Sequence, residues 1–303
     1  MTAMQHRLLR WYRRHGRAML PWRLVRSPYH ATISEFMLAQ TQVDRVVPAF
    51  QSFVQRFPDF ASLARASRAE VLRQWRGLGY NLRAIRLQRL AKIVVELHDG
   101  ALPSKSTALR ALPGVGAYTA AAIRAFGFGL DDAPVDTNIA RIVHRLCFGI
   151  EHPPIAGARE LRVRARELVP SGLSHDWSSA MMDLGATICT ARAPKCLLCP
   201  LRADCAAAPI DAARLEDARA AWGLYRSPQD SLPFKRTTRY ARGRIIEWLR
   251  DLPAGQRVSL LDLHNAVGPA MPERSVEEVR EFVAALERDG LVTRDGNDVA
   301  LRE

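Results

Sequence analysis

The chain has 303 residues, enough for two or three domains, and 48% hydrophobic with 25% charged residues is typical of a globular protein. No run approaches 18 apolar residues and the basic start of the chain has no long apolar stretch, which argues against a membrane span and a secretory signal. The formal net charge of +13 favours a polyanionic partner, above all nucleic acid, although the predominance of arginine over lysine shows that codon usage contributes.

Helical periodicity dominates the first 220 residues, and strictly alternating β-branched runs are absent from them. We therefore expect this part to be all-α. The helical patterns cover residues 5–17, 31–57, 61–74, 81–98, 105–111, 136–148, 157–168 and 176–188.

The segment "LPGVGAYT" joins two of the expected helices. Gly114 and Gly116 flank Val115, so the chain can turn tightly there and expose backbone N–H groups at the start of the next helix. Such a turn is suited to binding phosphate, although many helix–turn–helix connections also contain glycine.

The pattern changes after a polar stretch with two prolines at 225–240, which predicts a linker. Helices are expected at 241–250 and 258–266, and "SVEEVREFVAALERDG" opens with a capping box. "LVTRDGNDVAL" then predicts two short strands about an Asp-Gly turn. Three helices and a hairpin indicate a winged helix.

Four of the five cysteines form one short run, separated by six, two and five residues. A cytoplasmic location, with thiols kept reduced, argues against disulfides. Four thiolates suit Zn²⁺ or a [4Fe–4S] cluster, and one compact run of uneven gaps favours iron–sulfur over zinc or unrelated thiols. The cysteines in question are Cys189, Cys196, Cys199 and Cys205.

Two other features concern this cysteine run. Lys195 lies between two of the cysteines, with arginines nearby, so the loop can press on a phosphate backbone or be simply solvated. The fifth cysteine, Cys147, lies in an apolar helical segment and is expected to be a core thiol.

These motifs together resemble the helix–hairpin–helix DNA glycosylases with an iron–sulfur cluster. "LPGVGAYTA", "PVDTNIARIVHR" and the cysteine run have the family's order, while "SEFMLAQTQ" and "WRGLGY" are similar to the MutY-type adenine glycosylases. The resemblance covers about residues 8–215. It implies a mainly α, two-lobed fold of a six-helix barrel plus a cluster domain, followed here by a winged-helix-like domain.

The resemblance, with the C-terminal pattern, also implies the domain boundaries. The expected division is a cluster domain of 1–26 and 134–222, a barrel of 27–133, a linker of 223–240 and a winged-helix-like domain of 241–303.

A catalytic pair follows from the same resemblance. Glu35 would protonate adenine at N7, since adenine leaves poorly otherwise, and Asp136 would stabilise the cationic sugar. Asn138 would orient Asp136. Tyr118 replaces the Schiff-base lysine of bifunctional relatives, which predicts a monofunctional enzyme. The alternatives are a surface carboxylate at Glu35, a helix cap at Asp136 and a packing residue at Tyr118.

The remaining implied contacts are with DNA, because the target base must leave the duplex. Gln40 and Tyr80 match wedge positions, although each also fits ordinary helix surface or core. The full set of expected DNA contacts is Trp22, Arg23, Gln40, Thr41, Tyr80, Gly114, Val115, Gly116 and Lys195.

The chain departs from the usual MutY type at its C-terminus, where a Nudix-like domain is replaced by the winged-helix pattern, as in shorter actinobacterial-like relatives. The expected recognition helix carries five carboxylates, which argues against insertion into the major groove. We expect a monomeric bacterial cytoplasmic, nucleoid-associated enzyme that acts on mismatched duplex DNA. Adenine removal opposite guanine or 8-oxoguanine is favoured, and the alternatives are a mismatch thymine or uracil glycosylase and a non-catalytic iron–sulfur regulator.

Overall fold

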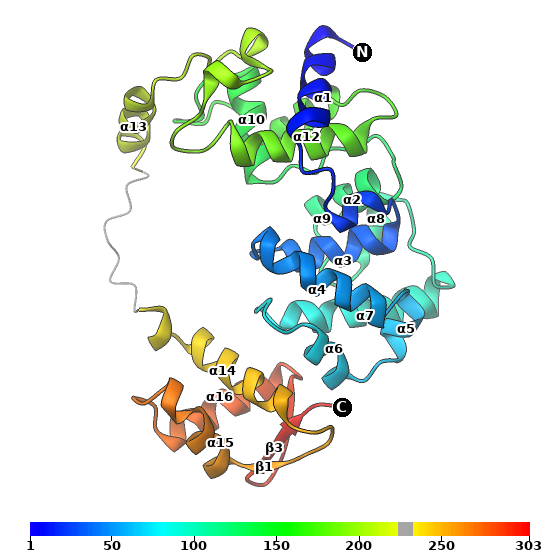
Figure 1. The fold of residues 1–303 in the computed structure, drawn as a ribbon, viewed down its shortest axis with the longest axis vertical. Coiled ribbons are helices and arrows are strands. Elements are labelled where there is room, and N and C mark those ends of the chain that lie inside the picture. The colour runs from blue at the N-terminus through cyan, green and yellow to red at the C-terminus, as the bar shows by residue number, and fades with distance from the viewer. Residues whose placement is uncertain (224–232) are drawn as a thin grey trace. The chain divides into compact units, whose positions relative to one another are not determined.

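The computed structural model describes residues 1–223 and 233–303, which are mainly helical as the sequence predicts (Figure 1). The chain forms two compact units. The first contains residues 1–35, 103–111 and the chain from 115 to 223, and the second contains 36–102, 112–114 and 233–303. Within the described ranges, no helix is long and apolar enough to cross a membrane.

The first unit is built on α1, α10 and α12, which pack around one apolar core. Leu8, Ile139 and Trp177 represent the three helices in that core. The helices of this unit are α1 (Ala3–His15), α2 (Pro21–Leu24), α3 (Pro28–Leu38, whose last turn belongs to the second unit), α8 (Ser106–Ala111), α9 (Ala117–Ala122), the π-helical turn η1 (Ile123–Gly127), α10 (Thr137–Cys147), α11 (Ala158–Glu167), α12 (Ser174–Thr187), α13 (Ala212–Ala221) and the single turns η2 (Cys196–Leu198) and η3 (Arg202–Asp204).

The second unit combines a helical part (36–102 and 112–114) with the C-terminal domain (233–303), and α6 of the helical part packs against α14 of the C-terminal domain. Its helices are α4 (Val43–Arg56), α5 (Phe60–Arg65), α6 (Arg68–Gln74), α7 (Leu82–His98), η4 (Phe234–Arg236), α14 (Thr238–Asp251), α15 (Leu260–Val267), η5 (Gly268–Ala270) and α16 (Val276–Arg288). Its strands are β1 (Val258–Ser259), β2 (Val292–Asp295) and β3 (Asp298–Leu301).

The C-terminal domain has the three helices and the hairpin that the sequence predicts. β2 and β3 pair antiparallel, with Val292 opposite Leu301, and the short β1 extends the sheet to the order β1-β3-β2. The capping box of α16 is formed as expected, with Ser275 accepting from the backbone of Glu278 and the Glu278 side chain accepting from the backbone of Ser275.

Two predicted helices are each divided in the structure. The pattern over 31–57 breaks between α3 and α4, where Gln40 has a φ of 63°. The pattern over 61–74 breaks at Ala66, because Ser67 accepts a hydrogen bond from the Glu70 backbone and so starts a new helix. Apolar periodicity continues through both breaks, and therefore did not reveal them.

The C-terminal boundary and α13 also differ from the pattern. Residues 224–232 of the expected linker lie outside the described residues, while α14 already begins at Thr238. Helix α13 was not predicted. Asp211 caps it by accepting from the backbone of Ala213 and Arg214.

Candidate active site

Glu35 lies on α3 among buried neighbours and is itself only 8% exposed. The pKa of its carboxyl group is raised to about 7, chiefly by burial and to a smaller extent by the charge of Asp136. A hydrogen bond from Tyr118 and the charge of Arg23 act in the opposite direction. Near neutral pH the group therefore holds a proton in a large fraction of molecules, as a general acid must.

Tyr118 lies in the first turn of α9, directly after the turn that contains Gly116. Its hydroxyl donates to the Glu35 carboxylate. Burial raises the pKa of the phenol well above its usual value, and the charges of Glu35 and Asp136 add to that effect. Tyr118 is therefore a neutral hydrogen-bond donor fixed on Glu35, and a phenol cannot form an imine with an opened sugar.

Asp136 is the N-cap of α10. One carboxylate oxygen, Oδ1, accepts from the Ile139 backbone N–H at 2.7 Å, and the other, Oδ2, accepts from Asn138 Nδ2 at 3.2 Å. Because both oxygens are held, the carboxylate has a fixed orientation. The structure thus brings together all four residues expected at the catalytic centre: Glu35, Tyr118, Asp136 and Asn138.

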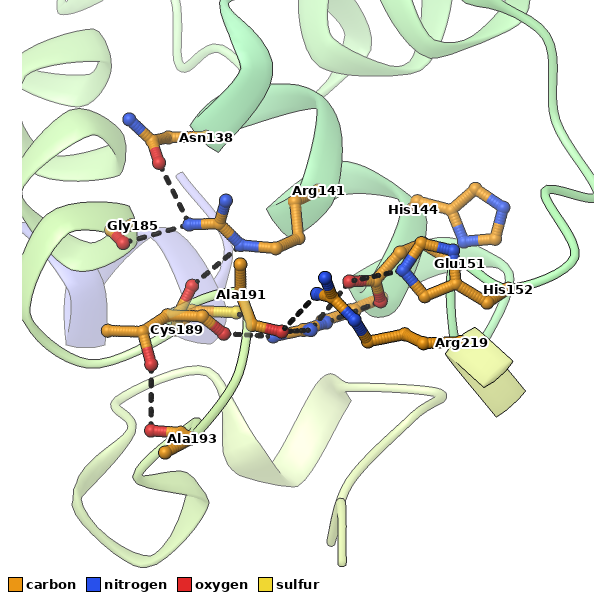
Figure 2. A network of polar contacts seen from close by, with 12 residues as sticks. Asn138, Arg141, His144, Glu151, His152, Gly185, Cys189, Ala191, Ala193 and Arg219 are labelled. Atoms are coloured by element: carbon orange, nitrogen blue, oxygen red, sulfur yellow. Dashed lines mark hydrogen bonds and ion pairs between the residues drawn. The ribbon is translucent and has the colours of Figure 1, made fainter. Parts of the chain in front are cut away.

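Asn138 is held in turn by Arg141, a residue that the sequence analysis missed. Arg141 Nη2 donates to Asn138 Oδ1 and to the Gly185 carbonyl, both at 2.9 Å, and its Nε donates to the Cys189 carbonyl at 2.9 Å (Figure 2). Helix α12 can approach this closely because a Cβ at Gly185 would lie 2.8 Å from the Asn138 Cβ. A chain of hydrogen bonds therefore joins Asp136 to the first cysteine of the run.

Arg23, an expected DNA contact, forms hydrogen bonds within the first unit. Its guanidinium donates to both oxygens of the buried Asp183, at 2.8 and 3.2 Å, and Arg17 binds the same carboxylate at 2.7 to 2.8 Å. Burial opposes ionisation of Asp183, yet the two arginines hold its pKa below the ordinary value. The sequence analysis did not identify Asp183 as a site residue. Trp22, the expected DNA contact next to Arg23, is buried.

The first unit contains a cavity of about 280 Å³, which is lined by Arg23 together with Tyr12, Arg26 and His175. His175 is 6% exposed and its Nε2 has no hydrogen-bond partner among the described residues. This cavity adjoins Arg23, the arginine that acts electrostatically on Glu35.

The four clustered cysteines are partly buried and none forms a disulfide. The pKa of the Cys199 thiol is raised to about 11, chiefly by burial and to a smaller extent by the charges of Cys189, Cys205 and Cys196, so the four thiols lie within electrostatic range of one another. In the described ranges, no set of three or more His, Cys, Asp or Glu side chains has metal-binding geometry. Lys195 is exposed between the first two cysteines.

The start of this loop is anchored by Arg145, whose side chain is 1% exposed. Its guanidinium binds both oxygens of Glu151 at 2.6 Å and donates to the Thr190 carbonyl at 2.8 Å and to Cys189 Sγ at 3.5 Å. Glu151 is therefore the counter-ion of Arg145, a buried cation that anchors the start of the cysteine loop.

Glu151→Ala is expected to lower the free energy of unfolding by about 3–5 kcal/mol, because it leaves the Arg145 guanidinium buried and unpaired. Urea denaturation followed by circular dichroism measures the change. Glu167→Ala is the matched control, since its ion pair with Arg164 is exposed to solvent and is expected to contribute little to stability. Equal effects of the two substitutions would contradict this account.

In the second unit, Thr41 and the loop of Tyr80 are joined by Arg83. Arg83 Nη2 donates to Thr41 Oγ1 and the Leu78 carbonyl, each at 2.9 Å. Tyr80 is 40% exposed with a φ of 45°, and Gln40 is exposed with a φ of 63°. Left-handed backbone at non-glycine residues is uncommon and is concentrated at functional sites.

The glycine turn adopts the conformation that its sequence predicts. Gly114 has a φ of 81°, and a Cβ there would lie 2.8 Å from the Phe36 ring, so two constraints require glycine. Val115 is buried and Gly116 is exposed. The turn therefore combines an apolar anchor with exposed backbone next to α9.

Comparison with known proteins identifies the family of this chain. Residues 33–170 match the HhH-GPD superfamily base excision DNA repair protein family. The chain is 36% identical over 298 residues to the adenine DNA glycosylase of Mycolicibacterium smegmatis, covering 95% of this chain and 93% of that protein. The chain belongs to the MutY-type family of helix–hairpin–helix DNA glycosylases.

Two further relatives bear on this MutY-type chain. The adenine DNA glycosylase of Mycobacterium tuberculosis is 35% identical over 298 residues, covering 95% of this chain and 89% of that protein, so the likeness includes the C-terminal domain. The solved structure of a thermostable thymine-DNA glycosylase matches with a TM-score of 0.62 and 31% identity, covering 67% of this chain and 93% of that one.

Proposed function

We propose that this protein is a monofunctional DNA glycosylase that removes adenine mispaired with guanine or 8-oxoguanine from duplex DNA. The observation that carries the proposal is a buried acid, Glu35, whose pKa is raised to about 7 beside Asp136. Two carboxyl groups in different environments can divide the roles of acid and charge stabiliser. The adenine DNA glycosylases among the relatives support the choice of base.

In the proposed reaction the mispaired adenine first leaves the helix stack. Glu35 then donates its proton to adenine N7, which makes the base a better leaving group. As the N-glycosidic bond breaks, the carboxylate of Asp136 stabilises the positive charge on the sugar, and water completes the hydrolysis. Asn138 and Arg141 keep Asp136 in place through the hydrogen bonds described above.

The test is single-turnover base release from duplexes that contain A:8-oxoG, A:G, T:G or U:G pairs. We expect release from the two adenine duplexes. A lack of adenine release would refute the proposal. Release of thymine or uracil would instead support the second candidate, a mismatch glycosylase, which the likeness to a thymine-DNA glycosylase favours. No release from any duplex would favour a non-catalytic DNA-binding role.

We further propose that Cys189, Cys196, Cys199 and Cys205 hold a [4Fe–4S] cluster. Free, mutually close thiols suit this group, as does the uneven spacing of the run. When bound, the cluster supplies a covalent staple for the loop and takes no part in bond cleavage. Lys195 is then presented to the DNA backbone, consistent with its exposure.

Cys199→Ser is expected to remove the iron and sulfide from the purified protein together with its visible absorbance, and to weaken duplex binding at least about tenfold through the loss of backbone contacts. Metal analysis and fluorescence anisotropy measure the two effects. Zinc without sulfide in the wild type would contradict the cluster. Cys147→Ser, at the thiol outside the run, is the control.

The partner in this proposal is mismatched duplex DNA, bound by a monomer in the bacterial cytoplasm at the nucleoid. Light scattering of the protein with and without a duplex tests the stoichiometry. A stable dimer in the absence of DNA would contradict it.

A further inference from the structure

Within the second unit, the loop of Tyr80 meets α14 of the C-terminal domain. Arg239, near the start of α14, donates to the Tyr80 hydroxyl, and its guanidinium carbon lies 4.7 Å from the centre of the Tyr80 ring. The same guanidinium lies 5.0 Å from the centre of the Phe234 ring. Tyr80, Arg239 and Phe234 are all exposed. The domain therefore contributes a cation and an aromatic ring to the surface around Tyr80.

The other neighbour of the Tyr80 ring is Arg83, with its guanidinium carbon 5.5 Å from the ring centre. This arginine is fixed, because it also donates to the carbonyls of Phe36 and Met37 at 2.7 and 2.8 Å. Burial lowers its pKa to about 10, which leaves it charged at neutral pH. Two arginines therefore contact the Tyr80 ring, one locked into the loop and one exposed.

The C-terminal end of α14 is attached to the same loop. Arg250 Nη2 donates to Asn81 Oδ1 at 2.7 Å, and Arg76 forms an ion pair with Asp251. Arg250 is 6% exposed, so this attachment is partly shielded from water. These contacts keep Arg239 beside Tyr80 in the absence of any ligand.

Charge indicates which ligand this surface suits. The segment from Phe234 to Arg250 contains six cationic residues and one carboxylate. Arg236, Arg242 and Arg244 are each neutralised by an ion pair, with Glu273, Asp289 and Glu247 respectively. For Arg239, by contrast, the described residues provide neutral aromatic partners and no carboxylate.

An exposed guanidinium that is oriented but not neutralised is suited to a phosphate group. The aromatic rings beside it are suited to a nucleic-acid base. Helix α16 is unsuited to such a ligand, since its segment carries five carboxylates.

We propose that Arg239 and Tyr80 form a composite DNA contact, in which Arg239 binds a backbone phosphate next to the base pair that Tyr80 meets. The C-terminal domain thus binds the duplex through the start of α14 rather than through α16. This inference rests on the proposed function for its ligand, a mismatched DNA duplex.

The test is the binding of Arg239→Gln to an A:8-oxoG duplex, measured by fluorescence anisotropy over a series of salt concentrations. Glutamine can still donate to the Tyr80 hydroxyl but carries no charge. We expect the Kd to rise about five- to tenfold near 0.1 M salt, and the slope of log Kd against log salt to fall by about 0.9, the value for one phosphate contact. Arg239→Lys is expected to keep the slope.

The matched control is Arg288→Gln, an exposed arginine on α16 of the same domain, which is expected to bind as the wild type does. An unchanged affinity and slope for Arg239→Gln would overturn the proposal. Tighter binding would overturn it as well, because Arg239 would then hold Tyr80 away from DNA. A lack of adenine release by the wild type would refute the proposed function without affecting this binding comparison.

Discussion

Glu35→Gln is expected to slow adenine release by about 10²- to 10⁴-fold, the contribution usual for a general acid. Glutamine has nearly the same shape and still accepts a hydrogen bond from Tyr118, but it has no proton to give to adenine N7. Duplex binding is expected to stay within about twofold of the wild type, since no DNA-binding charge is removed. Single-turnover base release and anisotropy measure the two quantities separately.

The raised pKa of Glu35 also determines the expected pH dependence of the reaction. Because the acid must be protonated and its pKa is raised to about 7, the single-turnover rate is expected to fall as the pH rises through 7. Tyr118→Phe removes a donor that stabilises the carboxylate form, so the pKa of Glu35 rises and this falling limb moves to higher pH. A residual rate in Glu35→Gln with the pH profile of the wild type would show that another group supplies the proton.

Much of the fold can be predicted from the sequence because its signals are local. The capping box of α16 involves two residues three positions apart, and the Asp-Gly turn between β2 and β3 is contiguous. The break at Gln40 was missed, because a left-handed residue inside an apolar periodic stretch has no local signature when it is not glycine. The Arg83 side chain, more than 40 residues away, encloses that break by donating to the Met37 carbonyl and to Thr41 Oγ1.

The candidate site likewise contains some residues that the sequence predicts and others that it does not. Glu35, Tyr118 and Asp136 belong to recognisable motifs, so their proximity could be expected before it was seen. Arg141 and Asp183 could not be identified, because their importance comes from partners far along the chain: Gly185 for the first and Arg23 for the second. A weak signal existed for Arg141, which follows Asn138 by three residues and so shares its helix face.

The contact between Tyr80 and Arg239 was still harder to predict from the sequence, since 159 residues separate the two. Sequence patterns indicated a winged helix and pointed to its acidic helix as unsuited to DNA. They did not indicate that α14 lies against α6 in the second unit and so brings an arginine to Tyr80. A function for the domain therefore depends on how it is attached rather than on the element that its fold class suggests.

Asp136→Asn is expected to slow adenine release by at least about 10²- to 10³-fold, because the charge that stabilises the cationic sugar is lost. Asparagine caps helices about as well as aspartate, so the hydrogen bond to the Ile139 backbone is retained. The amide cannot also accept from Asn138 through its nitrogen, and the lost hydrogen bond is expected to cost about 1 kcal/mol of unfolding free energy. Such a small loss of stability leaves the protein folded, so the rate reports the missing charge.

Asp211→Asn is the matched control, since Asp211 also caps a helix through its side chain but lies at the start of α13. It is expected to release adenine at the wild-type rate. Asp136→Ala separates the two roles further, because it also removes the cap of α10 and is expected to cost about 1 kcal/mol more than Asp136→Asn. If Asp136→Asn released adenine within about tenfold of the wild-type rate, helix capping would be the role of Asp136, and charge stabilisation of the sugar would have to come from elsewhere.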